Sequence, residues 1–454
     1  MTIQREDVGN VEYKIEIYRN GKVVTSPEGI TNVKDFVPGV EIFESITSAA
    51  MECKLIVQDA AGLIGAMTGS ELFKIQVIGT IVDKTYFFRA YNIESRSRYN
   101  GVDVFIINCT SEEFMKNESV NVFGHSSVIF SGETESSSIV KKLLQKQFLG
   151  TQKKLFLEST INKHEFVVPN WRPFDLIYWL AQRSIRKAKK GGTLQNGFVF
   201  YENSLGYHYK SIDKLIADVE DQAKTQQTNF QSGTPKLYKY VHSPLHLDDG
   251  ATDEFKISAI VFPEERNYLM GLRHGAWSGY SIGFDPVTIT ESKMGLSTDM
   301  SVDAYRYSIK ELWKKMEHLN GKRNVSPISQ MDTAVQAMID YPKRVRYTML
   351  PNQTFDPKYK DNPQKNYEEL VELQAYQYLR FESFKNIKLQ IKVPGNLDLY
   401  AGSGIEVVIP ANYNANTIQN DKKYSGRYII AGITHQIAND VLTSELMLVK
   451  DSVV

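Results

Sequence analysis

The pattern closest to a metal site is a pair of histidines near the middle of the chain. His242 and His246 are four residues apart, and Asp248 and Asp249 follow closely. In a helix this spacing would direct both imidazoles towards one ion, and imidazole and carboxylate groups are common zinc ligands. Pro244 lies between the two histidines, however, and proline disfavours a helix interior. We therefore interpret this stretch as an extended loop and expect no metal there.

Two pairs of adjacent acidic residues could supply the two carboxylates that a glycoside hydrolase needs. These are Glu112 with Glu113 and Glu264 with Glu265. The chain contains 53 aspartate and glutamate residues, so adjacent pairs arise by chance. We interpret both pairs as parts of a solvated surface.

A basic run from Lys187 to Lys190 could bind phosphate groups. The simpler interpretation is the C-terminal end of a helix, where cations interact favourably with the helix dipole. Gly191 and Gly192 follow the run and would end that helix. We expect a basic helix end rather than a phosphate site.

Several sequence motifs for common catalytic chemistry are absent. The chain has no phosphate-binding loop with its Lys-Ser/Thr and no G-x-G-x-x-G after a strand. It also lacks HExxH and CxxC. We therefore expect no catalytic residue, no cofactor and no enzymatic activity.

The clearest local organisation lies between Phe166 and Leu215. Its spacing predicts a strand, a helix, a two-stranded hairpin and a second helix. Pro173 suits the first turn of the first helix, because its missing N–H has no intrahelical partner to lose. The hairpin would turn at residues 203–206, and Ser211 can cap the second helix.

This segment resembles the central baseplate hub protein of T-even-type contractile-tailed phages. That family carries a segment of the form W-x-P-F…I-x-W-L…F-Y-E-x…G-Y-x-F-x-S-I-D-x-L. The matching residues here also include Ile177, Leu180, Tyr209, Ile212 and Leu215. The resemblance implies a structural or interface role for Trp171, Pro173, Phe174, Trp179, Phe200, Tyr201, Glu202, Gly206, Tyr207, Ser211 and Asp213.

Four aromatic side chains in this segment could instead stack on a sugar: Trp171, Trp179, Tyr201 and Tyr207. Large amphipathic rings serve protein cores and subunit interfaces equally well. We therefore favour a core or an interface for them.

Composition excludes several classes of protein. The chain has 454 residues, and roughly 100–200 residues per domain suggests two to four domains. Lysine plus arginine equals aspartate plus glutamate at 53 each, so the formal net charge is zero. General binding to nucleic acid or to an anionic membrane needs a basic surface, which this balance does not predict.

The compartment can be inferred from the cysteines and the N-terminus. Cys53 and Cys109 lie in separate strand-like runs, and we expect buried free thiols. Residues 1–7 are polar and charged, which is unlike a signal peptide. No apolar run approaches the roughly 20 residues that span a bilayer. We expect synthesis in a reducing cytoplasm and no stable membrane insertion.

Strand patterns at the two ends of the chain predict a mainly β, α+β protein. Alternating apolar residues at 13–17 and 387–393, with turn signals between short runs, favour small barrels. The two ends also share a strand rhythm, with hairpin turns at 100–101 and 439–440. This echo is weak by itself, but the hub resemblance implies two similar antiparallel β-barrels per chain.

We therefore expect two barrels with helix-containing insertions. The boundaries are 1–112 for the first barrel, 113–250 for an α/β domain with the helix-hairpin-helix segment, 251–262 with 376–454 for the second barrel, and 263–375 for an inserted mixed helical domain. Within the last, residues 305–319 predict one helix, and 351–365 an exposed loop.

The resemblance also implies the function. Three copies of a duplicated barrel would form a ring that joins a six-fold tail tube to a three-fold spike. The implied partners are two further copies of the chain, the spike protein, a tube initiator or tube protein, and the tape-measure protein. DNA would pass through without sequence-specific binding. The implied location is the tail baseplate of the virion, assembled in the host cytoplasm.

Two other functions remain open. One is the hub of a related contractile injection or secretion system, for which we would expect a fused spike domain; this sequence ends at Val454 without one. The other is a tail-associated cell-wall hydrolase or a carbohydrate-binding protein, which would use an acidic pair or the aromatic residues.

Overall fold

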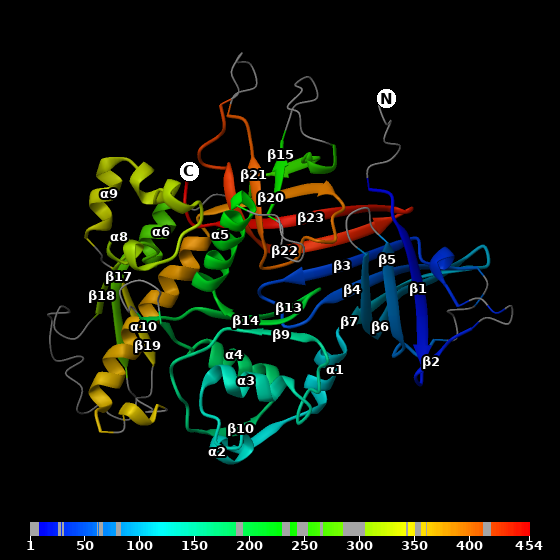
Figure 1. The fold of residues 1–454 in the computed structure, drawn as a ribbon, viewed down its shortest axis with the longest axis horizontal. Helices are drawn as coiled ribbons and strands as arrows, with labels where there is room; N and C mark the ends of the chain where they lie inside the picture. The colour runs from blue at the N-terminus through cyan, green and yellow to red at the C-terminus, as the bar shows by residue number, and fades with distance from the viewer. Residues whose placement is uncertain are drawn as a thin grey trace.

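The protein is mainly β, with one large sheet and four small ones (Figure 1). The computed structural model describes residues 9–25, 29, 31–60, 62, 67–78, 83–187, 194–228, 237–242, 253–263, 267–284, 305–341, 344–349, 356–359, 361–411 and 419–454. Within these ranges, no helix has the length and apolar character needed to cross a membrane.

Strands from both ends of the chain build the large sheet. The N-terminal strands are β1 (Glu12–Arg19), β2 (Lys22–Val23), β3 (Gly39–Ser45), β4 (Glu52–Asp59), β5 (Leu72–Ile78), β6 (Asp83–Tyr99) and β7 (Val102–Thr110), with a short helix η1 (Lys34–Phe36). The later strands are β15 (Tyr238–Val241), β16 (Ala259–Val261), β20 (Ile387–Pro394), β21 (Gly404–Val408), β22 (Gly426–Ala438) and β23 (Val441–Lys450), with η2 (Asp253–Phe255).

One pair of strands joins the two ends into a single sheet of 13 strands. β3 pairs antiparallel with β22, from Gly39 opposite Ala438 to Ser45 opposite Gly432. We call this pairing the seam. The strand order is an open path from β16 to β2, and the described pairings do not close either half into a ring. The described pairings thus show two halves of one sheet and do not confirm the predicted pair of closed barrels.

Each half of the sheet has its own apolar core. The N-terminal core contains the inward-facing residues of β1, β3, β4, β5 and β7, and the C-terminal core those of β20 to β23. Ile437 and Leu442, beside the β22–β23 turn, pack in the N-terminal core. The halves therefore share contacts as well as hydrogen bonds. Cys53 and Cys109 are opposite each other on β4 and β7, and both are buried free thiols as predicted.

Both predicted hairpin turns are present. Asn100 and Gly101 connect β6 to β7 with φ angles of 48° and 82°. Asn439 and Asp440 connect β22 to β23 with φ angles of 51° and 63°. Two successive residues with positive φ match the right-handed twist of the flanking strands, and Asn, Asp and Gly tolerate that conformation best.

The middle of the chain, from α1 to α5, packs helices on a small sheet, and we call it the middle segment. Its elements are α1 (Glu112–Ser119), β8 (Val122–His125), α2 (Ser126–Ile129), α3 (Ser136–Leu144), β9 (Lys154–Leu157), β10 (Val167–Trp171), α4 (Pro173–Ala181), β11 (Arg186–Lys187), β12 (Leu194–Gln195), β13 (Phe198–Asn203), β14 (Gly206–Ser211) and α5 (Ile212–Thr228). Side chains of α3 and α4 share one core with β13 and β14. The predicted helix, hairpin and helix are α4, β13–β14 and α5.

The prediction that α4 continues into the basic run was wrong. The helix ends at Ala181, and Arg186 and Lys187 lie on β11, paired with β12. Arg186 is buried, and its Nε lies 2.6 Å from Glu158 Oε1. Arg186 and Lys187 therefore belong to a strand with a buried ion pair and do not form a solvent-exposed helix end. Residues 188–190 lie outside the described part of the chain.

The segment between β16 and β20 forms a further unit, which we call the insert. Its elements are α6 (Tyr268–His274), β17 (Ser278–Phe284), β18 (Tyr305–Ser308), α8 (Ile309–Leu312), η3 (Trp313–Lys315), η4 (Gly321–Arg323), η5 (Pro327–Gln330), α9 (Thr333–Ile339), β19 (Val345–Met349), η6 (Pro357–Tyr359) and α10 (Pro363–Phe384). The strands form a sheet in the order β18-β17-β19.

Two expectations about the insert were wrong. Residues 305–308 form a strand paired with β17, so only Ile309–Leu312 follow the predicted α-helix. The helix α10 was not predicted, although it runs for 22 residues across position 375. Its apolar residues pack against β17 and β18 and reach Trp277 and Tyr307, contacts that a local pattern does not reveal.

We predict that Gly206→Ala destabilises the protein far more than Gly101→Ala. Gly206 has φ +139°, and an added Cβ would lie 2.2 Å from Lys154 O on the neighbouring strand β9. We expect a loss of roughly 3 kcal/mol in the free energy of unfolding, because β9 must move away. Gly101 also has positive φ but has no atom within 4 Å of the added carbon. Its loss should be about 1 kcal/mol. Chemical denaturation of both variants checks this, and equal losses would contradict it.

Candidate functional site: a buried polar junction

The residues of the family motif lie on four neighbouring elements. Trp171 ends β10, and α4 carries Pro173, Phe174 and Trp179. The hairpin carries the others up to Ser211, and Asp213 lies in the first turn of α5. Ser211 Oγ accepts a hydrogen bond from Lys214 N–H at 3.0 Å, which is the predicted cap. The structure thus brings the predicted residues together in one region.

Aromatic residues of the motif form the core on one face of the hairpin. The ring centroids of Phe174 and Phe200 are 5.3 Å apart, and those of Phe200 and Tyr207 are 5.7 Å apart. Trp171 and Trp179 pack beside these rings, and their own ring centroids are 5.8 Å apart. Tyr201 points to the opposite face, where it packs against α5. Tyr201 and Tyr207 are buried, so neither offers an open ring face to a sugar.

Glu202 connects the hairpin to the N-terminal half of the sheet. Its buried carboxylate accepts hydrogen bonds from Met51 N–H at 3.1 Å and Ser111 Oγ at 2.5 Å. Lys153 Nζ lies 2.5 Å from Glu202 Oε1 and 2.6 Å from Glu113 Oε2. Burial raises the pKa of Glu202, and Lys153 and Ser111 offset that rise only in part. One lysine therefore holds two buried carboxylates.

Asp213 connects the second helix to the insert and to the C-terminal end of the chain. Its carboxylate accepts hydrogen bonds from Glu317 N–H and Tyr376 OH, both at 3.0 Å. Arg380 Nε lies 3.4 Å from Asp213, and Arg380 NH1 donates to Asp451 at 3.1 Å. Asp213, Arg380 and Asp451 are all buried. Four separate segments thus meet at one charge network.

His318 adds a further side chain to this network. Its Nδ1 lies 2.8 Å from an Asp451 carboxylate oxygen, and its Nε2 lies 2.6 Å from the carbonyl oxygen of Trp313. Burial would raise the pKa of Asp451, but His318, Arg380 and Leu319 N–H outweigh it and lower that pKa. Asp451 is thus held by side chains of the insert from two directions.

The sequence did not identify Glu44, which links both halves of the sheet to the hairpin. Glu44 is buried on β3 and accepts hydrogen bonds from Ser204 N–H at 2.9 Å and Ala401 N–H at 3.0 Å. Burial raises its pKa to about 7, although these two donors act in the opposite direction. One signal was present: Glu44 continues the inward-facing positions of Val40 and Ile42. A carboxylate on an apolar strand face predicts a buried acid.

We call Glu44, Glu202 and Asp213, together with the donors described above, the polar junction. Its polar groups face one another and leave no open carboxylate pair. Among the described residues, no cluster of three or more His, Cys, Asp and Glu side chains could hold a metal ion. What the junction can do is fix the sheet, the middle segment and the insert relative to one another.

The two acids of the pair Glu112 and Glu113 have separate partners. Glu113 is buried against Lys153 and Thr151, so its assignment to a solvated surface was wrong. Its neighbour Glu112 instead lies 3.5 Å from Arg89 and 3.7 Å from Lys116. His242 follows β15, and His246, Asp248, Asp249, Glu264 and Glu265 lie outside the described residues.

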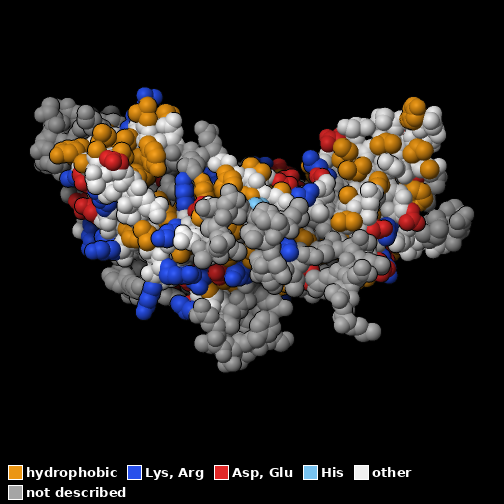
Figure 2. All heavy atoms as spheres, turned by 90° about the horizontal axis from the view of Figure 1, so that it is seen from above, with side chains coloured by type: hydrophobic (Ala, Val, Ile, Leu, Met, Phe, Trp, Pro, Cys, Tyr) orange, Lys and Arg blue, Asp and Glu red, His pale blue; other side chains and the backbone are white. Residues whose placement is uncertain are grey.

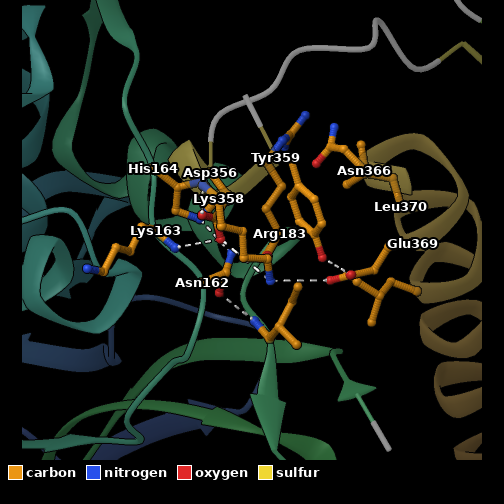
Figure 3. Close-up of a pocket in the computed structure, with 12 residues that line it drawn as sticks. Asn162, Lys163, His164, Arg183, Asp356, Lys358, Tyr359, Asn366, Glu369 and Leu370 are labelled. Carbon is orange, nitrogen blue, oxygen red and sulfur yellow. Dashed lines mark hydrogen bonds and ion pairs between the residues drawn. The ribbon is translucent and has the colours of Figure 1, made fainter. Parts of the chain in front are cut away.

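A small cavity of about 40 Å³ lies between the middle segment and the insert (Figure 3). Lys163 N–H donates to Asp356 at 3.3 Å, and Asn162 accepts from Ile185 N–H at 2.9 Å. Lys358 Nζ lies 3.8 Å from Glu369 on α10. This volume has room for only a few water molecules. The cavity lies within a polar contact between the two units, and it is too small for a substrate.

Comparison with known proteins gives matches in fold only. No protein-family model matches the sequence, and no curated protein matches it. A tail protein from Neisseria meningitidis MC58 is similar with a TM-score of 0.51 at 10% identity, over 97% of this chain and 97% of that chain. The 43 kDa tail protein of prophage MuSo2 from Shewanella oneidensis gives 0.49 at 8% identity, over 96% and 98%. A chain of the Francisella PdpA–VgrG complex gives 0.45 at 10% identity, over 97% and 58%.

The Neisseria tail protein therefore shares the fold over nearly the whole chain. The comparison covers the sheet, the middle segment and the insert together, because so little of either chain is left out.

We predict that Lys153→Met lowers the free energy of unfolding by about 3 kcal/mol, because two buried carboxylates then lack their shared cation. Adding Glu202→Gln should recover part of the loss, since one of the two charges is gone. The control is Lys116→Met, whose partner Glu112 is exposed and which should change stability by less than about 1 kcal/mol. Denaturant titrations measure all three. Equal losses for Lys153→Met and Lys116→Met would contradict the role of Lys153 as the shared cation of two buried carboxylates.

We also predict that Glu44 makes stability depend on pH. Its folded-state pKa of about 7 lies above the ordinary 4.5, so the folded state binds the proton more tightly. The stabilisation is complete below pH 4.5 and is lost as pH rises through 7. Wild-type protein should lose about 2–3 kcal/mol relative to Glu44→Gln between pH 5 and pH 8. Parallel stability curves for the two proteins would exclude a buried acid of raised pKa.

Proposed function

We propose that this chain is a structural protein of a contractile tail, the central hub of its baseplate. The observation that carries the proposal is the fold shared with the Neisseria tail protein over 97% of both chains. The motif between residues 166 and 215 supports the same family, because its polar residues occupy the junction that holds the units together. The proposed location is the baseplate of a virion, with assembly in the host cytoplasm.

The two halves of the large sheet suit a change of symmetry. Each half has its own apolar core, and the seam joins them within one chain. In the proposed ring, three chains present six such halves to a six-fold tube and keep three-fold symmetry towards the spike. Residues 1–112 and residues 251–262 with 376–454 are the proposed pair of barrels. Residues 113–250 and residues 263–375 are the proposed additional domains.

The proposed mechanism is mechanical. The ring holds the spike on one face and the tube on the other, and the tape-measure protein ends in its lumen. Contraction would transmit force through the hub, release the spike and open a path for DNA. A rigid chain suits this task, and the polar junction and the seam both oppose relative movement of the units.

A catalytic role lacks support among the described residues. Glu112 and Glu113 have separate partners, and Lys153 neutralises Glu113. The aromatic residues proposed for sugar stacking pack mainly against one another. We therefore propose a protein without enzymatic activity.

We predict that the purified chain forms a ring of three copies. Light scattering should give about 155 kDa, three times the chain mass of 51.7 kDa, and electron microscopy should show an open centre. If the spike is needed for trimerisation, co-expression with the spike protein of the same tail should give a complex of equal copy number. A monomer that also fails to bind the spike protein would contradict the hub.

A further inference from the structure

Two helices of the insert leave an open apolar groove on the surface. It lies between α6 and α9, measures about 610 Å³ and has Trp277 as its floor. Large apolar side chains that line it are exposed to solvent: Leu269 by 64%, Met338 by 55% and Tyr341 by 76%. Figure 2 shows hydrophobic side chains gathered at the left end of the molecule, where Figure 1 places α6 and α9.

Contacts with the core of the insert hold α6 and α9, the two helices beside the groove, in place. An added Cβ on Gly271 would lie 2.5 Å from the ring of Trp277, so α6 packs on this ring as closely as a helix can. Ser278 Oγ donates to Ile339 O at 2.5 Å and ties the end of α9 to β17. Trp277 and Ile339 are both buried in the core of the insert. The groove is thus a preformed feature.

The described lining of the groove carries positive charge. Arg273 is the only charged residue among the described residues that line it. Arg344 lies beside it, with its Cβ 3.2 Å from the position of an added Cβ on Gly275. Asp340, which caps the C-terminal end of α9, forms an ion pair with Lys310 at 3.1 Å. An occupant that brings carboxylates would find cationic partners at the rim.

We propose that this groove binds an amphipathic helix of a partner protein, with apolar residues on one face and acidic residues beside them. Two helices with exposed apolar side chains leave the space that a third helix fills, with anchors at i, i+3/i+4 and i+7. Contiguous exposed apolar surface of this kind marks interaction sites. The carboxylates of the partner pair with Arg273 and Arg344. This site is on the insert and does not depend on the proposed hub role.

Two synthetic helical peptides with identical leucine spacing test the proposal. One carries glutamate beside the apolar face, and the other carries lysine at the same positions. Fluorescence anisotropy with the full chain should show about tenfold tighter binding of the glutamate peptide. Arg273→Glu should abolish this preference or reverse it. The double variant Leu269→Ser with Met338→Ser should weaken the binding of both peptides.

Matched variants distinguish specific peptide binding in the groove from nonspecific binding elsewhere on the surface. Lys116→Glu changes the same charge outside the groove, and Phe123→Ser removes an apolar side chain that is 73% exposed on β8. Neither should change binding. The proposal is overturned if neither peptide binds at millimolar concentration, if both bind equally, or if Lys116→Glu has the effect of Arg273→Glu. Concentration-dependent self-association that Met338→Ser abolishes would assign the groove to a second copy instead.

Discussion

A carboxylate that leaves water must meet donors or a cation, and this requirement determines how the units of the protein are joined. An unpaired buried charge is strongly destabilising, so such groups persist only where partners surround them. Glu44, Glu202 and Asp213 each satisfy the requirement with groups from segments far apart in the sequence. These donors come from the sheet, the middle segment, the insert and the C-terminal end, so the three acids hold all of these units in the observed arrangement.

The seam gives the same chain a second source of rigidity. β3 and β22 are almost 400 positions apart in sequence, yet their backbones pair over seven residues. Apolar residues beside the β22–β23 turn then pack into the N-terminal core. A continuous sheet with interlocked cores resists shear between its halves. This property would suit the proposed ring between a tube and a spike.

The position of the family motif has a consequence for recognition. Its residues lie mostly inside the chain, where they maintain the fold and the polar junction. Contacts with partners must therefore come largely from surfaces that the motif does not include. The apolar groove between α6 and α9 is such a surface, because its exposed side chains have no role in the core beneath them. In this proposal, the fold and the choice of partner are encoded in different parts of the sequence.

Local chemistry in the sequence determined the mainly β class, both hairpin turns, the proline-initiated helix α4 and the burial of the cysteines. Alternation, turn residues and caps act within a few residues of one another, so a single sequence displays them. Tertiary structure alone decided the end of α4, the strand at 305–308 and the formation of α10, since each depends on packing against a distant element. It also decided the polar junction. The sequence shows that Glu202 and Asp213 are acids in a motif, but only the folded chain brings Lys153 to Glu202 and Arg380 to Asp213.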